Sequence, residues 1–221
     1  METIADMGGT RGWGRAPVPV DEPVFAESWE GRAFALTLLS MGRVSGRNLD
    51  AFRHALERLP RDDYLADGYY GRWLNAAELM LTDSAILAPG AVNARARANR
   101  GEQTDQPAFP EPNKPDYQNT AAGQLRTVAE PPRFAVGDRV RAKDIHPEGH
   151  TRLCGYLRGH RGVIELIQPA AVLPDTNAHF LGENPQYVYA VGFDSHELWG
   201  PDAESFRLHV DLFESYLEAD E

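Results

Sequence analysis

The hydrophobic pattern of the chain changes at Phe134-Ala-Val-Gly-Asp-Arg-Val-Arg141, where apolar and polar residues begin to alternate around a Val-Gly-Asp turn. Such alternation is typical of a half-buried β-strand. Four later segments also have strand patterning, at residues 161–167, 187–193, 197–199 and 206–213. Five short strands with Gly-rich turns in about 90 residues predict a small SH3-like β-barrel, which we assign to residues 133–221.

Upstream, residues 31–100 have helical patterning instead. Asn48 is a favourable N-cap, Asp50 suits the first turn, and Pro60 ends the apolar stripe that follows. Two further helices are expected, over residues 28–42, with Gly42 as the stop, and over residues 69–81. Residues 82–90 should then form a short closing turn.

Two segments lack a core of their own. Residues 1–30 are rich in Gly and Pro and predict an extended arm that wraps a partner, with disorder as the alternative. Residues 101–132 contain six prolines among polar residues and predict a linker. The predicted fold class is therefore α+β, with an extended arm, a helical region, a linker and a C-terminal barrel.

Composition excludes several functions. The net charge of -11 and the pI of about 5.1 argue against nucleic acid, since an acidic surface repels phosphates. No apolar run is long enough to span a membrane, and the acidic N-terminus is unlike a signal peptide, so we expect a cytoplasmic protein. The single cysteine, Cys154, cannot by itself form an internal disulfide or a thiolate metal site.

A few side chains admit a functional interpretation beside a structural one. Arg53 lies at the border of its helix's apolar arc, where it either extends its charge to water or points it at an anion on a partner. Arg152 lies in a loop, where arginines are usually solvated. The aromatic cluster between Tyr69 and Trp73 either packs in a core or forms a wall with hydroxyls for hydrogen bonds.

Histidines do not provide a convincing metal site. His146 and His150 are four residues apart, a spacing that suits a metal on a helix. Pro147 and Gly149 lie between them, so this segment is not expected to be helical. No phosphate-binding loop, nucleophile elbow or zinc-protease motif is present either.

The order of these segments resembles the nitrile hydratase β subunit from one end of the chain to the other. The similar stretches are Asp6–Pro17, Asp21–Glu30, Leu49–Arg58, Gly68–Trp73, Phe134–Arg141, Gly149–Ile164, Glu197–Pro201 and Val210–Glu218. Only the linker lacks a clear counterpart. The combination is specific because the matches keep their order over nearly the whole chain.

The resemblance implies an enzyme that adds water to nitriles to give amides. Nitrile hydratases are α/β heterodimers, often paired into heterotetramers, and their low-spin Fe(III) or non-corrin Co(III) lies in a cysteine-rich loop of the α subunit. Some cysteines of that loop are oxidised and carry anionic oxygens. This chain should hold no metal and should be active only with the α subunit.

The resemblance also implies roles for particular residues. Arg53 and Arg152 match two arginines that bind the oxygens of the oxidised cysteines, and Tyr69 matches a tyrosine that forms hydrogen bonds near the metal centre. These three residues are the predicted catalytic set. A guanidinium suits such oxygens because it offers two charge-assisted donors at once.

The predicted substrate pocket comes from the same comparison of motifs. Leu49, Phe52 and Trp73 match residues that line it, and Thr37 stands where some relatives carry an aromatic residue. A slim, apolar nitrile suits walls of this kind. Trp73 is more often found in cobalt-type relatives, so the metal of the partner is expected to be cobalt rather than iron.

Three alternatives are less consistent with the sequence. A thiocyanate hydrolase subunit shares the scaffold, but its corresponding region is split between two chains. A metallochaperone or activator of the family is far shorter. A non-catalytic SH3-like interaction protein would not need the arginine-bearing helix.

Overall fold

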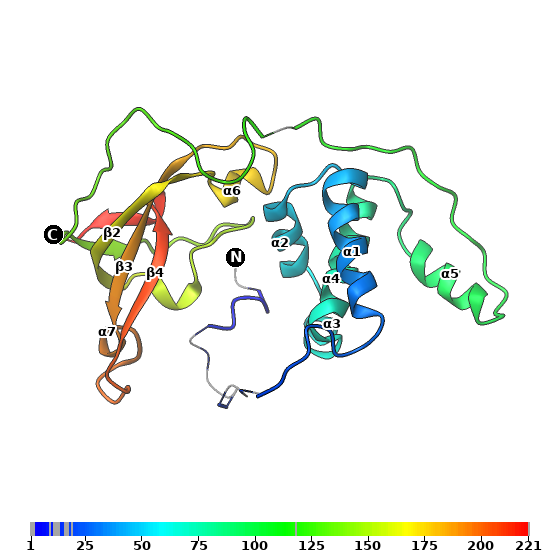
Figure 1. Ribbon diagram of the computed structural model, residues 1–221, viewed down its shortest axis with the longest axis horizontal. Coiled ribbons are helices and arrows are strands. Elements are labelled where there is room, and N and C mark those ends of the chain that lie inside the picture. The colour runs from blue at the N-terminus through cyan, green and yellow to red at the C-terminus, as the bar shows by residue number, and fades with distance from the viewer. Residues whose placement is uncertain are drawn as a thin grey trace. The chain divides into compact units, whose positions relative to one another are not determined.

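A computed structural model describes residues 3–8, 10, 14, 15, 18, 20–117 and 119–220. The chain divides into two compact units, a helical unit over Pro17–Gln118 and a second unit over Met1–Ala16 with Asn119–Glu221. Figure 1 shows the elements of both. Parts of the predicted arm lie outside the described residues: Met1, Glu2, Gly9, Arg11 to Trp13, Ala16, Pro17 and Pro19.

The helical unit has more helices than the sequence predicted. They are α1 (Glu30–Leu38), the π-helical η1 (Leu39–Val44), α2 (Leu49–Glu57), α3 (Arg61–Ala66), α4 (Gly68–Asp83) and α5 (Ala91–Asn99). The three predicted helices are present, but Gly42 lies inside η1 and does not end the first helix. Both α1 and α2 pack against α4.

The start of α2 follows directly from its sequence. The side chain of Asn48 accepts a hydrogen bond from the backbone N–H of Ala51 at 2.8 Å, which satisfies one of the donors left free at a helix start. Phe52 and Ala55, one turn apart, face inwards and pack with residues of α4. The cap and this apolar face fix which side of α2 remains outside.

The second unit is built on one antiparallel sheet. Its strands are β1 (Arg139–Ala142), β2 (Arg161–Ala171), β3 (Gln186–Asp194), β4 (Arg207–Phe213) and β5 (Leu217–Ala219), in the order β4-β3-β2-β1-β5. The sheet is open, with β4 and β5 as its edges. Short helical turns complete the unit: η2 (Gly155–Leu157), α6 (Pro174–Asn177), α7 (Ser195–Trp199) and η3 (Glu214–Tyr216).

One predicted strand is wrong. Residues 197–199 belong to the short helix α7, which begins where the side chain of Asp194 accepts a hydrogen bond from the N–H of His196 at 2.8 Å. The fifth strand is instead β5, which pairs with β1 and forms the edge of the sheet opposite β4. A strand of three residues is too short to be recognised from alternation of apolar and polar residues. Its pairing partner, β1, also lies far away in the sequence.

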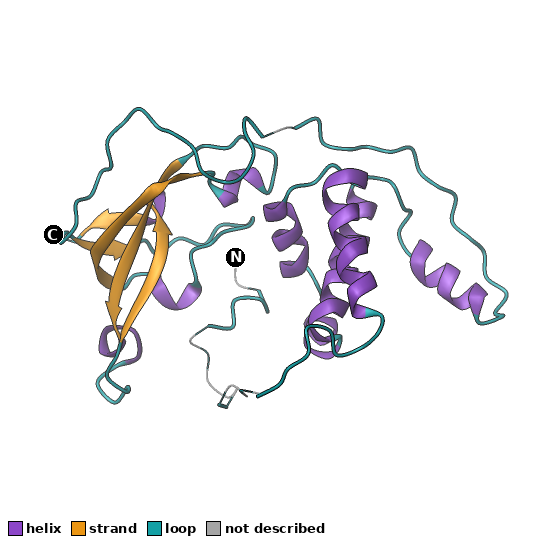
Figure 2. Ribbon diagram, in the orientation of Figure 1, coloured by secondary structure: helices purple, strands orange, loops and turns teal. Residues whose placement is uncertain are grey.

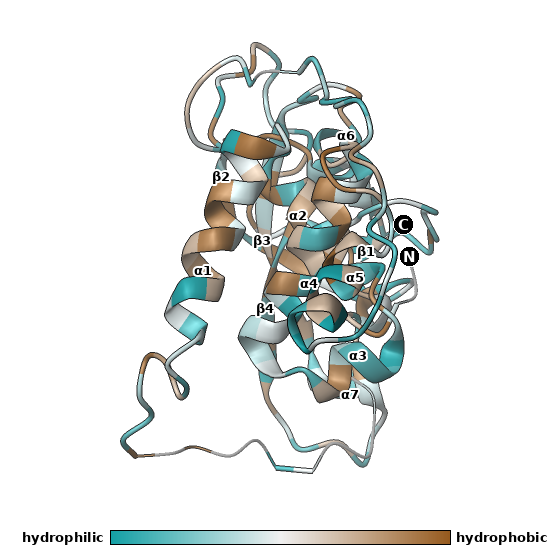
Figure 3. Ribbon diagram, turned by 90° about the vertical axis from the view of Figure 1, so that its right-hand side faces the viewer, coloured by the Kyte–Doolittle hydropathy of each residue, from teal (hydrophilic) through white to brown (hydrophobic). Residues whose placement is uncertain are grey.

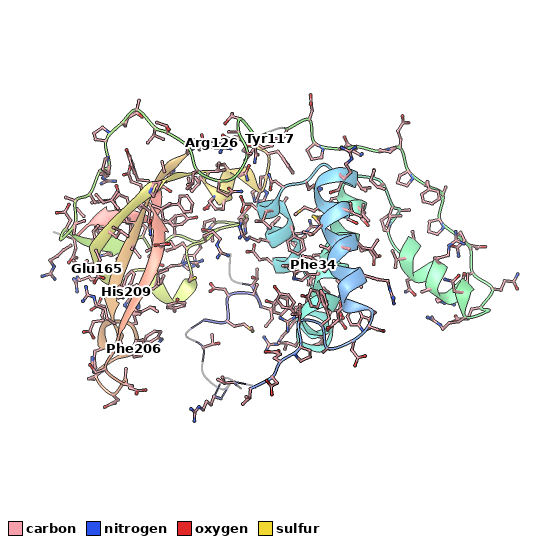
Figure 4. All side chains as sticks on the ribbon, in the orientation of Figure 1. Phe34, Tyr117, Arg126, Glu165, Phe206 and His209 are labelled. Carbon is pink, nitrogen blue, oxygen red and sulfur yellow. The ribbon has the colours of Figure 1, made fainter. Side chains whose placement is uncertain are left out.

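Gly192 of β3 allows an ion-pair cluster to cross that strand, from β2 to β4. Glu165 of β2 reaches over it to Arg207 and His209 of β4, the His209 contact being 2.6 Å (Figure 4). A Cβ atom at Gly192 would collide with the Glu165 carboxylate. Beneath, the core is formed by large buried residues of several strands: Val140, Ile164, Tyr189, Phe193 and Leu212.

The predicted linker contains no helix or strand among its described residues (Figure 2). It is nevertheless held by each unit at one end. In the helical unit, the N–H of Asn113 donates to the carbonyl oxygen of Ser84 at 2.8 Å. In the second unit, Arg126 forms a two-pronged ion pair with Glu183 at 2.6 and 2.8 Å (Figure 4). Of the helices formed by the described residues, none combines the length and the apolar character needed to cross a membrane.

Candidate functional site

Arg53 projects from the outer border of α2. Its Nη1 donates to Oδ1 of Asp50 at 2.9 Å, one helical turn earlier. The side chain of Asp50 is 1% exposed and that of Arg53 is 38% exposed. The guanidinium is therefore fixed on its inner side by a buried carboxylate and open on its outer side.

Aromatic side chains form a continuous surface beside this helix. The ring centre of Trp73 lies 5.0 Å from the ring centre of Phe52 and 5.6 Å from that of Tyr69. Phe34 of α1 also contacts Trp73, at 5.6 Å, and Tyr70 completes the cluster. Figure 3 shows the apolar character of α1, and Figure 4 labels Phe34.

The predicted site residues of the helical unit differ in exposure. Tyr69 is 62% exposed and Leu49 is 39% exposed, whereas Phe52 is buried and Trp73 is half-buried. Thr37 is completely buried, and its Oγ1 has no hydrogen-bond partner among the described atoms. Thr37 therefore presents no surface in this chain on its own.

Sequence reasoning missed two members of this surface. Phe34 and Phe25 pack on Tyr70, at 6.3 and 5.3 Å between ring centres. Phe34 lies one helical turn before Thr37, so helical spacing offered a signal for it. Phe25 lies in the arm, where the sequence has no helical or strand periodicity that could have indicated it. A cavity of about 410 Å³ opens beside the two tyrosines, Tyr69 and Tyr70, with Glu22 and Glu30 on its rim.

Arg152 belongs to the second unit and lies in the loop before η2. Its side chain is exposed, while its backbone N–H donates to the hydroxyl of Tyr216 at 3.1 Å. The same hydroxyl donates to Asp175. Burial and then the Asp175 carboxylate raise the pKa of Tyr216, so this hydroxyl stays protonated as a donor. The loop is thus attached to the buried Tyr216 and, through it, to the half-buried Asp175.

The two spaced histidines are engaged in other contacts. A ring nitrogen of His146 lies 3.0 Å from Nη1 of Arg158, and the other lies 3.1 Å from Asp144. The backbone N–H of His150 donates to the ring of His179 at 3.0 Å. Within the described parts of the chain, no three His, Cys, Asp or Glu side chains are grouped to hold a metal ion.

Known proteins match almost the entire chain. The family described as "Nitrile hydratase beta subunit, N-terminal" matches residues 1–124, and "Nitrile hydratase beta subunit, C-terminal" matches residues 123–219. A nitrile hydratase subunit beta of Pseudomonas putida is 38% identical, covering 99% of both chains. The low-molecular weight cobalt-containing nitrile hydratase subunit beta of Rhodococcus rhodochrous is 36% identical over 98% of this chain and 99% of its own.

A thiocyanate hydrolase subunit alpha of Thiobacillus thioparus matches much less. It is 32% identical over 42% of this chain and 77% of its own. The nitrile hydratase β subunits, which match both halves of the chain, are therefore better counterparts than the thiocyanate hydrolase subunit, which matches only a part.

Proposed function

Because the chain belongs to the nitrile hydratase β-subunit family, an enzyme family that hydrates nitriles to amides, we propose that it completes the active site of a metal-bearing α subunit. The observation that carries this proposal is the 38% identity to a nitrile hydratase subunit beta over 99% of both chains. The alignment runs through the arm, the helical unit, the linker and the sheet, so it also covers the linker, for which the motifs alone gave no counterpart.

Arg53 and Arg152 are proposed to donate hydrogen bonds to the oxygens of oxidised cysteines in the α subunit. The fixed inner side and open outer side of Arg53 support this role, since Asp50 takes up one of the five donors of a guanidinium. Arg152 has an exposed head on a loop held by Tyr216. Donors oriented in advance stabilise a buried anion at little cost in side-chain entropy.

The metal belongs to the partner in this proposal. When bound there, it supplies Lewis acidity toward the nitrile. The role of this chain is to fix the oxygens around that centre. Cobalt is favoured over iron by Trp73 and by the cobalt-containing relative of Rhodococcus rhodochrous.

The substrate pocket is proposed to use the aromatic surface of the helical unit. Leu49, Phe52 and Trp73 supply apolar walls, and the exposed hydroxyl of Tyr69 is available for a hydrogen bond at the metal centre. Thr37 is buried in this chain, so it would affect the pocket through the residues that pack on it and not by contact with the substrate. Removing the exposed parts of Leu49, Phe34 and Tyr69 from water favours association with a partner.

The assembly is proposed to be an α/β heterodimer that pairs into a heterotetramer. We further propose that residues 133–221 form an SH3-like barrel, with the arm at residues 1–30, the helical domain at 31–100 and the linker at 101–132. Support comes from the continuous run β1 to β4 and the return of β5 to β1. The pairing of β2 with β3 contains register shifts, and irregularities of this kind bend a strand.

The test is nitrile-to-amide turnover by this chain alone and by the chain co-expressed with the neighbouring α-like gene product in cobalt-supplemented medium. We expect activity only in the co-expressed sample, with the two chains co-purifying. Absence of both activity and co-purification would contradict the proposed function and favour a non-catalytic interaction protein instead.

A further inference from the structure

The loop that carries Arg152 is contacted by the very start of the chain. Within the second unit, Oδ2 of Asp6 accepts a hydrogen bond from the backbone N–H of Gly155 at 2.8 Å. Gly155 follows Arg152 by three residues and begins the helical turn η2. A carboxylate that binds a backbone N–H at a turn restricts that turn, because the bond is charge-assisted.

Two glycines make this contact close. A Cβ atom on Gly155 would lie 2.8 Å from Oδ2 of Asp6, and one on Gly8 would lie 2.6 Å from Cε1 of Tyr156. Both distances are below van der Waals contact, so a larger residue at Gly155 would displace the Asp6 carboxylate, and one at Gly8 would push against the Tyr156 ring. Tyr156 in turn stacks on Trp199 with ring centres 5.9 Å apart, and both rings pack against the core. The N-terminal segment thus rests on a rigid support.

Other contacts hold the same loop from inside the unit. Arg158, which is 8% exposed, donates from Nη2 to the carbonyl oxygen of Leu153 at 3.2 Å. The hydroxyl of Tyr216 accepts from the N–H of Arg152 itself. Asp6 supplies the constraint at Gly155, and it comes from a segment separated from the loop by 149 residues.

We propose that Asp6 is a positioning residue for Arg152. By holding Gly155, it limits the movement of the loop and so the directions in which the Arg152 guanidinium points. Gly8 permits this contact by letting the chain lie against Tyr156. The inference rests on the proposed function of Arg152, and it gives the first part of the arm a role within this chain's own second unit.

Cys154 provides a probe of the contact that does not depend on catalysis. It is the only cysteine of the chain, lies next to Gly155 and is half-buried. Burial and then the carboxylate of Asp6 raise the pKa of its thiol. Loss of Asp6 should therefore increase both the access to this thiol and its thiolate fraction, which is the reactive form.

The first measurement is the rate at which iodoacetamide alkylates Cys154 in the purified full chain. We expect Asp6→Ala and, independently, Gly8→Ala to raise this rate at least about threefold, as both release the segment. Asp21→Ala, at an exposed aspartate in the other part of the arm, is the matched control and should leave it unchanged. Unchanged rates in both Asp6→Ala and Gly8→Ala would overturn the contact.

The second measurement is turnover by the complex with the α subunit. Asp6→Ala should lower kcat about fivefold or more with little change in KM, and Asp6→Asn should recover part of the loss because its amide oxygen still accepts the hydrogen bond. Combining Asp6→Ala with Arg152→Lys should cost less than the product of the single losses, since both act on one group.

Two results would separate the inference from the proposed function. If Arg152→Lys lowers kcat while Asp6→Ala changes only the alkylation rate, Asp6 does not position Arg152 and the inference is overturned. If Arg152→Lys itself leaves turnover intact, the role proposed for Arg152 fails instead.

Discussion

Nη1 of Arg53 lies 2.9 Å from Oδ1 of Asp50, and the aspartate is completely shielded while the arginine is not. The two residues lie three positions apart on α2, so the helix itself sets their spacing. This pair turns a flexible surface arginine into an oriented one.

Arg53→Lys should lower nitrile turnover by about 10- to 100-fold while assembly with the α subunit stays largely intact. A lysine keeps the charge but loses the planar fork that binds two acceptors at once. The measurement is kcat/KM of the purified complex, with gel filtration to confirm assembly. Arg43→Lys, at an exposed arginine of the same unit, should behave as wild type. Near-wild-type turnover by the Arg53 variant would remove it from the site.

Tyr69→Phe should reduce kcat by up to about tenfold, because a lost hydrogen bond costs about 0.5–1.5 kcal/mol. The ring is retained, so the aromatic contacts with Tyr70 and Trp73 persist. Tyr70→Phe is the matched control, since the ring of this neighbour packs on Phe25 and Phe34 and no role near the metal centre is proposed for its hydroxyl. Equal effects of the two substitutions would argue against a specific hydroxyl at Tyr69.

Asn48→Ala should destabilise the helical unit by about 1 kcal/mol, the usual cost of a lost N-cap. Asn48→Asp should retain most of the stability, because its carboxylate also accepts from the N–H of Ala51. Urea titration followed by circular dichroism provides the measurement. A stability unchanged by the alanine would mean that tertiary packing alone sets the start of α2.

Glu183→Gln should remove a pH-dependent part of the stability. Hydrogen bonds from Arg126 lower the pKa of Glu183 from 4.5 to about 2. A carboxyl with a depressed pKa in the folded state stabilises fully above its unfolded pKa and loses this as the pH falls through the folded value. The stability difference between wild type and variant should therefore be larger near about pH 6 than near about pH 3.

The control for that series is Glu148→Gln, which removes the same charge at an exposed position. Denaturant midpoints measured at both pH values give the comparison. A difference for Glu183→Gln that does not change with pH would mean that the ion pair with Arg126 contributes no pH dependence.

The purified chain on its own should contain no stoichiometric cobalt or iron, because the proposed metal ligands belong to the α subunit. Elemental analysis after expression in cobalt-supplemented medium tests this. One metal ion per chain would contradict the proposed division of roles between the subunits.

Local sequence patterns were sufficient for several elements. The apolar face of α2 and its Asn48 cap predict that helix, and its bounds in the structure are Leu49–Glu57. The strands β2, β3 and β4 fall within or close to the segments predicted from alternation. For the site, the family resemblance named Arg53, Tyr69 and Arg152 without any geometry, and their proposed roles remain to be tested.

Other features were out of reach of local patterns. The helix α7 and the strand β5 were both missed, since one depends on a single capping contact of Asp194 and the other on pairing with β1. The complete burial of Thr37 was equally unforeseen, because it depends on how the residues of the helical unit pack around it.

What the sequence by itself determined are the helices with a regular apolar face, the change to strand patterning at Phe134 and the family. Their causes act between residues a few positions apart, within one turn or one strand. Only the tertiary structure decided that Asp6 binds Gly155, that Arg126 holds Glu183 and that Glu165 crosses Gly192 to reach β4. Each of these contacts joins residues distant in the chain, and their approach is set by packing and strand pairing that no local pattern contains.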